Sequence, residues 1–159
     1  MNRAVAVLRI FFGLVFLTNG AAKLIPGIAH LPGGYFLIDS EGARGIIQHN
    51  ARHHPVAAYH DLVFNFLVPN WTFIGPLVGL TEVAAGLLLV FGFASTLGAL
   101  LGAALTLHIQ FSDANGPWLY EYAVEWVSLL CLAFMHAGRT WGLDGRLGAS
   151  NRHWRRLFG

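Results

Sequence analysis

Charged residues are scarce in this chain of 159 residues: only 11% are Asp, Glu, Lys or Arg, against about 25% in a typical soluble domain. Hydrophobic residues make up 55% of the chain, and the mean hydropathy is +0.56. This composition argues against an ordinary soluble enzyme, a disordered chain and a protein that binds nucleic acid through a basic surface. We therefore expect a lipid bilayer around the protein and no nucleic-acid partner.

Cysteine is almost absent as well. Cys131 stands alone, which excludes an internal disulfide and any metal or iron–sulfur site built from several cysteines of this chain. The sequence also has no dinucleotide-binding fingerprint and no haem-attachment motif. Any multi-electron chemistry would therefore depend on a cofactor held by a partner.

Long apolar runs are what the sequence has in place of charge. Crossing a bilayer core takes about 20 apolar residues in a helix. Four runs approach that length, over about 4–25, 73–93, 95–111 and 118–136. They are too long for barrel strands and do not alternate with polar residues. The sequence thus predicts an all-α integral membrane protein, a four-helix transmembrane bundle forming a single domain over 1–159.

The arginines predict how this bundle is oriented. Arg3 precedes the first run, and a larger set follows the fourth: Arg139, Arg146, Arg152, Arg155 and Arg156. Positive residues favour the cytoplasmic side, so both termini and the tail 137–159 are predicted there. We expect the first run to be retained, because it exceeds a typical signal-peptide core. The arginine tail would contact anionic lipid or an acidic partner.

The connection over 26–72 is then exported and too long for a simple turn. One helical face within it collects Val56, Tyr59, Val63, Phe66 and Leu67. This spacing predicts an extracytoplasmic amphipathic helix on the outer interface, between the first and second spans.

Histidines are frequent in the same connection. His49 and His53 have the i, i+4 spacing of a weak metal site, but no carboxylate pattern accompanies them. We expect a solvated, pH-responsive loop and no metal.

Ionisable residues inside the runs are the candidate functional groups, since each costs about 2.5 to 3.5 kcal/mol at the centre of a bilayer unless it is paired. Lys23, His108, Glu121 and Glu125 are predicted near the outer ends of the runs, where they would form one polar cluster able to move protons. A network of structural ion pairs is the alternative.

Glu82 lies near the middle of the second run. It must pair with Arg9, stay protonated or face a polar cavity. Two further motifs, Gly75-xxx-Gly79 and Gly98-xxx-Gly102, predict close approach of helices within the chain or between chains.

Three patterns together resemble the DoxX family. They are Arg9-xxx-Gly13-xx-Phe16-xxx-Gly20-xx-Lys23, Glu82-xxx-Gly86-xx-Leu89-xx-Gly92 and Trp141-Gly142-Leu143-Asp144. That family consists of small four-helix bacterial and archaeal membrane proteins, some of them subunits of thiosulfate:quinone oxidoreductase. The resemblance implies a multi-pass protein of the cytoplasmic (inner) membrane and adds Asp144 to the candidate polar groups.

Two functions follow from these observations. The first is a subunit of a quinone-linked redox complex. A bound quinone would lie in an aromatic slot formed by Phe11, Phe12, Phe16 and Trp126. The polar groups of this site would be Arg9, Lys23, Glu82, His108, Glu121 and Glu125. The second is a non-catalytic structural or assembly subunit. Both functions require other membrane subunits as partners, and the residues alone do not decide whether the chain is an enzyme.

Overall fold

The computed structural model describes residues 3–34, 37–114, 120–151 and 154, and within these ranges the chain is helical, with no strand. Four helices form the bundle: the long α1 (Arg3–Leu24), α4 (Trp71–Phe91) and α5 (Ser95–Ser112), and the shorter α6 (Ala123–Phe134). Between α1 and α4 lie α2 (Ser40–Arg52), α3 (Ala57–Leu62) and a π-helical turn (Val63–Leu67), and α7 (Leu143–Ser150) follows α6. Single 3-10 turns occupy Ile28–His30 and Ala137–Arg139.

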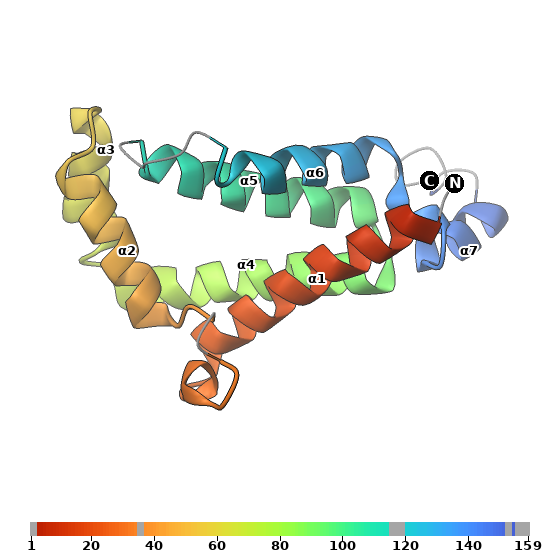
Figure 1. Ribbon diagram of the computed structural model, residues 1–159, viewed down its shortest axis with the longest axis horizontal. Coiled ribbons are helices and arrows are strands. Elements are labelled where there is room, and N and C mark those ends of the chain that lie inside the picture. Colours follow the sequence, from red (N-terminus) through yellow and green to blue (C-terminus); the bar gives the residue numbers. More distant parts are fainter. Residues whose placement is uncertain (1–2, 35–36, 115–119, 152–153, 155–159) are drawn as a thin grey trace.

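The four bundle helices lie side by side as two layers, α1 with α4 and α5 with α6 (Figure 1). The start of α1 and the whole of α7 lie at one end, which we call the terminal end. Helices α2 and α3 cross the opposite end, which we call the capped end. This arrangement confirms the all-α fold.

Three of the predicted runs match helices closely, because α1, α4 and α5 begin and end within two residues of them. The fourth run was predicted from 118, but residues 115–119 lie outside the described part of the chain, and α6 begins at Ala123. By length and hydropathy, α1 and α4 are able to cross a membrane, and α6 is a shorter apolar helix.

Glycines bring α1 and α4 together. A Cβ on Gly86 would stand 2.6 Å from the backbone nitrogen of Leu17, and a Cβ on Gly20 would stand 2.7 Å from the carbonyl oxygen of Gly79. Gly13 meets α4 in the same way, at the backbone of Val90. The glycines recur every seven residues on both helices, which keeps them on the facing sides of an antiparallel pair.

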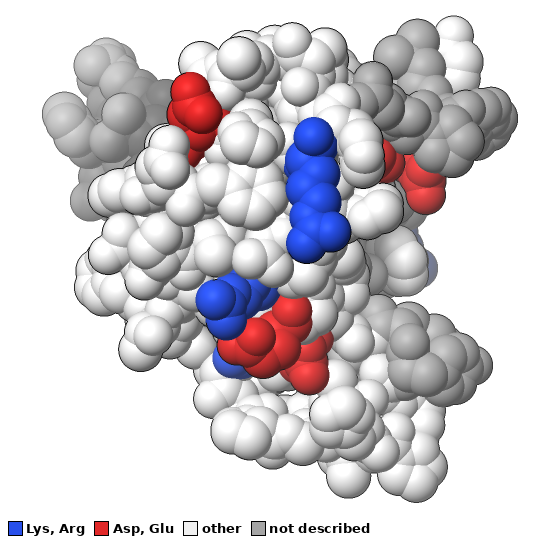
Figure 2. All heavy atoms as spheres, turned by 90° about the vertical axis from the view of Figure 1, so that its left-hand side faces the viewer, with Lys and Arg blue, Asp and Glu red and all other residues white. Residues whose placement is uncertain are grey.

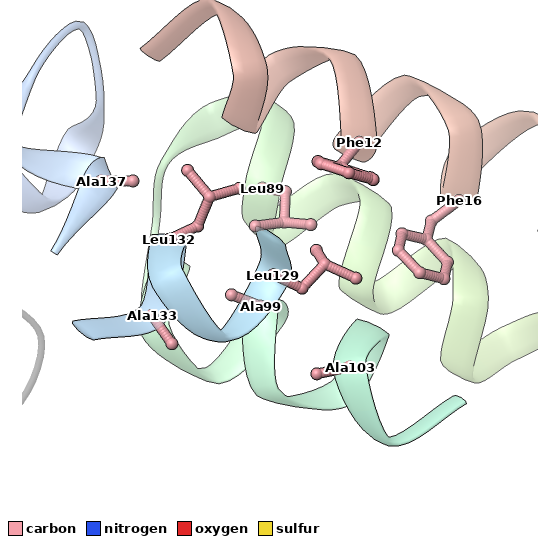
Figure 3. Close-up of a cluster of buried hydrophobic side chains, with 9 residues drawn as sticks. All are labelled: Phe12, Phe16, Leu89, Ala99, Ala103, Leu129, Leu132, Ala133 and Ala137. Carbon is pink, nitrogen blue, oxygen red and sulfur yellow. The ribbon is translucent and has the colours of Figure 1, made fainter. Parts of the chain in front are cut away.

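A compact apolar core joins both layers (Figure 3). It takes Phe12 and Phe16 from α1, Leu89 from α4, Ala99 and Ala103 from α5, Leu129, Leu132 and Ala133 from α6, and Ala137 from the turn after α6. Phe12 and Phe16 are therefore core residues, and Phe11 points outward with 57% of its surface exposed. The predicted aromatic slot built on these three side chains was wrong.

The capped end has its own small core of Ala51, Tyr59 and Val63. The predicted amphipathic helix is present, but its face is divided: Tyr59 and Val63 are buried, whereas Val56 and Phe66 are exposed. The π-helical turn changes the residue spacing at Val63, so positions 3.6 residues apart no longer share one face.

Helix α2 is a further helix in this connection, beginning where the Asp39 carboxylate accepts a hydrogen bond from the backbone N–H of Gly42 at 2.7 Å. Seen end-on, the capped end is largely uncharged, with one group of adjacent acidic and basic side chains and a few isolated charged ones (Figure 2). Arg44 and Glu41 of α2 form a partly exposed pair at 3.5 Å.

Candidate functional site

Asp144 is the centre of a polar network at the terminal end. Its carboxylate is fully buried and accepts hydrogen bonds from the backbone N–H groups of Ala94 and Ser95, at 2.7 and 2.8 Å. Those two groups begin α5, where unpaired N–H groups favour a negative charge. The indole of Trp154 donates a third hydrogen bond at 3.1 Å. The carboxylate at the start of α7 thus caps α5.

Arg9 approaches the same network from α1. Its guanidinium is fully buried, interacts electrostatically with Asp144 and donates one hydrogen bond from Nη2 to the carbonyl of Trp141 at 3.2 Å. Nη1 lies so close to Gly92 and Gly142 that a Cβ at either glycine would collide with it. Nε and Nη1 have no hydrogen-bond partner among the described residues.

Unusual backbone geometry is concentrated at this end. Within the described segments, three non-glycine residues have positive φ angles: Ala94 at 44°, His136 at 47° and Trp141 at 53°. They occupy the link between α4 and α5 and the segment between α6 and α7. Such conformations cost of order 1 to 3 kcal/mol each and persist where the surroundings impose them, frequently at functional sites.

A cavity of about 790 Å³ opens beside this network. The end of α4 contributes Phe91, the turn after α6 contributes Arg139 and Trp141, and α7 contributes Arg146 and Ala149. Its wall therefore combines aromatic surface with two guanidinium groups. The sequence placed both arginines in a tail and gave no indication of a cavity there.

Lys23 and Glu82 form a second buried pair, between α1 and α4. The Lys23 ammonium nitrogen lies 2.9 Å from a Glu82 carboxylate oxygen, and only 6% and 11% of the two side chains is exposed. Side chains in a helix lean toward its N-terminus. In this antiparallel pair, Lys23 therefore leans toward the terminal end and Glu82 toward the capped end, so that the two side chains meet.

This pair changes two of the predicted contacts. Glu82 contacts Lys23 instead of Arg9, which lies with Asp144. Lys23 is consequently not part of a cluster with His108, Glu121 and Glu125.

Those remaining three residues lie on the other helix layer or beside it. His108 is an exposed residue of α5, Glu121 is exposed in the turn before α6, and Glu125 is half-buried in the first turn of α6. No ion pair joins any of them within the described part of the chain. Lys23 is ion-paired with Glu82 on its own layer, and the role of His108, Glu121 and Glu125 in moving protons stays a prediction.

His108 does have an aromatic environment at the capped end. The hydroxyl of Tyr59, on α3, lies 3.4 Å from His108 Nε2, and the Tyr59 ring packs edge-on against Phe111 at 5.2 Å. Burial raises the pKa of Tyr59 above its ordinary value, so the hydroxyl keeps its proton at neutral pH. The sequence did not identify Tyr59 as a polar candidate, because its spacing is that of an apolar helix face.

His54 holds this region in place. Its Nδ1 accepts a hydrogen bond from the backbone N–H of Val56, so Nε2 carries the proton and donates to the carbonyl of Phe111 at 2.9 Å. The rings of His49 and His53 lie 6.4 Å apart. No group of three or more potential metal ligands occurs in the ranges that the structure covers, and the role of these two histidines stays a prediction.

Arg152, Arg155 and Arg156 of the predicted tail lie outside the described residues. Of the other candidates, Lys23 and Glu82 form a buried ion pair, Arg9 and Asp144 are buried and interact electrostatically, and His108 is exposed beside the buried Tyr59. The buried groups hold helices together, whereas the exposed His108 can exchange a proton with a ligand.

Comparisons with known proteins identify the family of the chain. No curated protein and no solved structure matches the chain. The family model described as DoxX matches residues 4–113, a region that contains Arg9, Lys23, Glu82 and His108 and ends before Asp144. Since this match covers well over half of the sequence, the chain belongs to the DoxX family of membrane proteins.

Proposed function

We propose that this chain is an integral membrane subunit of a quinone-linked redox complex in the cytoplasmic (inner) membrane of a bacterium or archaeon. In this proposal α1, α4, α5 and α6 all cross the bilayer, and both termini are cytoplasmic. The partner subunits carry the electrons, because the sequence has one cysteine and no dinucleotide fingerprint.

The outward faces of the helices support four spans. Large apolar side chains are exposed on all of them, with Phe11 57% exposed on α1, Phe73 71% on α4, Leu107 50% on α5 and Phe134 79% on α6. Contact between such apolar faces and lipid costs no free energy, whereas their contact with water is unfavourable. Since the four helices lie side by side, a bilayer that surrounds α1 and α4 also surrounds α5 and α6 (Figure 1).

The contact between Tyr59 and His108 is the observation that carries the quinone assignment. A quinone site needs an aromatic wall and polar groups that bond to the carbonyl oxygens and exchange protons. Phe111 supplies the wall, 48% exposed, while the hydroxyl of Tyr59 and the imidazole of His108 supply the polar groups. His108 is exposed on a helix of the bundle, so a quinone diffusing in the lipid can reach it.

A non-catalytic structural or assembly subunit is the second candidate. The two buried pairs favour it, because Arg9, Asp144, Lys23 and Glu82 are all engaged in contacts between helices. Under this function the same side chains hold a rigid bundle against which a partner packs.

Quinone binding by the purified chain distinguishes the two functions. We would reconstitute the protein in nanodiscs and titrate it with a short-chain quinone, following the quenching of tryptophan fluorescence. The variants Tyr59→Phe and His108→Gln each remove one hydrogen-bonding group and should weaken binding by roughly tenfold, the effect of losing about 1.4 kcal/mol.

His49→Gln is the matched control, because His49 is an exposed histidine of the same capped end. It should leave quinone affinity unchanged. Absence of saturable quinone binding, or an equal loss in the control, would reject the quinone-linked function and favour the structural subunit.

A further inference from the structure

We propose that the cavity at the terminal end binds a phosphate-bearing anion, either the headgroup of an anionic phospholipid or free phosphate. The site is distant from Tyr59 and His108, at the opposite end of the bundle, and does not depend on quinone binding (Figure 1). Only its lipid form rests on the proposed placement in a membrane.

Charge at the terminal end is unbalanced. Arg139 and Arg146 both line the cavity, and both are exposed, so a ligand entering from solvent or from the membrane surface can reach them. Guanidinium groups offer several N–H donors in a planar arrangement that matches phosphate oxygens. The cavity thus presents two groups suited to the same anion.

Asp144 is the acidic residue closest to these arginines in the sequence, and no other Asp or Glu follows Glu125. Its carboxylate is fully buried and accepts hydrogen bonds from Ala94, Ser95 and Trp154, and it forms no ion pair with Arg139 or Arg146 among the described residues. Both guanidinium groups therefore remain available to donate hydrogen bonds to a ligand.

Arg9 adds a second, independent observation. It is fully buried, its Nε and Nη1 lack a hydrogen-bond partner among the described residues, and Nη1 lies directly behind Gly142, which forms part of the cavity wall. This guanidinium therefore adds unsatisfied N–H donors immediately behind the wall, while its charge interacts with the Asp144 carboxylate.

The shape of the cavity fits the same class of ligand. Its volume of about 790 Å³ is within the range of small-molecule sites, and Phe91 and Trp141 border the two arginines. Tryptophan side chains such as that of Trp141 commonly lie at the depth of lipid headgroups. A phospholipid would place its phosphate on the arginines and its glycerol and first acyl carbons on the aromatic surface.

Two binding experiments separate the two sources of the anion. In the first, the protein is reconstituted into phosphatidylcholine nanodiscs with increasing phosphatidylglycerol, and native mass spectrometry after release counts the retained phosphatidylglycerol. In the second, the protein in neutral detergent is titrated with inorganic phosphate by calorimetry. Arg139→Gln and Arg146→Gln should each weaken the observed binding about fivefold, as expected for one basic residue near an anionic headgroup.

Two further variants test whether a cavity is involved. Arg52→Gln removes an exposed arginine of α2 at the capped end and should have no effect. Ala149→Trp keeps every charge but fills the cavity that Ala149 lines, and it should abolish binding. A melting temperature of each variant equal to that of the unmodified protein would show that the fold is retained.

Saturable binding in either experiment, weakened about fivefold in both arginine variants and abolished in Ala149→Trp, supports the site and identifies the source. Binding that Ala149→Trp leaves intact, or that Arg52→Gln weakens equally, would show general charge attraction and overturn the proposal. Absence of saturable binding in both experiments would overturn it as well. None of these outcomes changes the test of quinone binding at His108.

Discussion

Asp144 connects three segments that are far apart in the sequence: α7, the start of α5 and, through Arg9, α1. Removing one member of a buried charged pair leaves the other uncompensated, which costs about 3 to 5 kcal/mol. We therefore expect Asp144→Ala to lower the free energy of unfolding by about that amount, because two buried N–H groups also lose their acceptor. Chemical unfolding in detergent micelles measures the change.

Asp61→Ala is the control for this variant, since Asp61 is an exposed carboxylate of α3 whose partner is the neighbouring His60. It should change the free energy of unfolding by less than about 1 kcal/mol. Combining Asp144→Ala with Arg9→Met should cost less than the sum of the single changes, because the two groups interact. Strict additivity would contradict the coupling between them.

Lys23 and Glu82 allow a second test with an internal comparison. Lys23→Met leaves the Glu82 carboxylate buried without its cation and should destabilise the protein by about 3 to 5 kcal/mol. The double variant Lys23→Met with Glu82→Gln removes both charges and should be more stable than the single variant. Melting temperatures in one detergent would rank the variants.

The exposed pair of Arg44 and Glu41 provides the contrast. Breaking it with Arg44→Gln should cost at most about 1 kcal/mol, because water screens both charges. If the double variant at Lys23 and Glu82 were as unstable as Lys23→Met alone, the destabilisation by Lys23→Met would not come from leaving the Glu82 carboxylate without its cation.

At the residue scale, the sequence identified the important polar side chains but not their partners. Arg9, Lys23, Glu82 and Asp144 were all singled out, because ionisable groups are costly in apolar helices. Pairing depends on helix rotation, which spacing alone does not specify. The lean of side chains toward a helix N-terminus favours the Lys23 and Glu82 contact once α1 and α4 are known to be antiparallel neighbours.

Helices α1 and α4 are held together chiefly by backbone approach, so glycine substitution tests this element directly. Gly86→Ala places a methyl group against the backbone of Leu17 and Gly13, which cannot move aside as a side chain can. We expect a loss of about 1 to 3 kcal/mol in the free energy of unfolding, the usual cost of overpacking. The measurement is chemical unfolding in detergent.

Gly45→Ala in α2 is the matched control, because nothing lies within 4 Å of its added Cβ. It should stabilise the protein by about 0.4 to 1 kcal/mol, since alanine restricts the unfolded chain and favours a helix. If both alanine variants behaved alike, close packing between α1 and α4 would not be the cause.

Elements with long apolar runs were predictable, and those without them were not. α1, α4 and α5 followed from run length, whereas α2 was missed because its polar sequence, with Gly42 and Gly45, has no long apolar run. α7 was missed for a related reason: it is an eight-residue helix whose buried residues are Asp144 and Gly148. Amphipathic spacing and tertiary contacts, not long apolar runs, determine such helices.

At the scale of the whole molecule, the two ends of the bundle differ in composition. The terminal end carries Arg3, Arg139 and Arg146, while the capped end carries Arg44, paired with Glu41, and the exposed Arg52. An excess of positive residues favours the cytoplasmic side of a membrane protein. Under the proposed membrane placement, the terminal end is therefore the cytoplasmic one, and α2 and α3 lie together at the other end (Figure 1).

This difference predicts which residues a membrane-impermeant thiol reagent reaches. In a Cys131→Ser background, we expect His49→Cys on α2 to be labelled in intact spheroplasts and Ala149→Cys on α7 to be labelled only after permeabilisation. Both positions are exposed, and they lie at opposite ends of the bundle. Mass spectrometry of the purified protein gives the extent of labelling at each cysteine.

The reverse labelling pattern would invert the orientation while leaving the bundle across the membrane. Labelling of both cysteines from one side would instead contradict a spanning bundle, because α2 and α7 are separated by the full length of α4 and α5. Helix α4 alone contains 21 residues, about 31 Å at 1.5 Å per residue, which matches the hydrocarbon thickness of a bilayer. A membrane that surrounds α4 must therefore place His49 and Ala149 in different compartments.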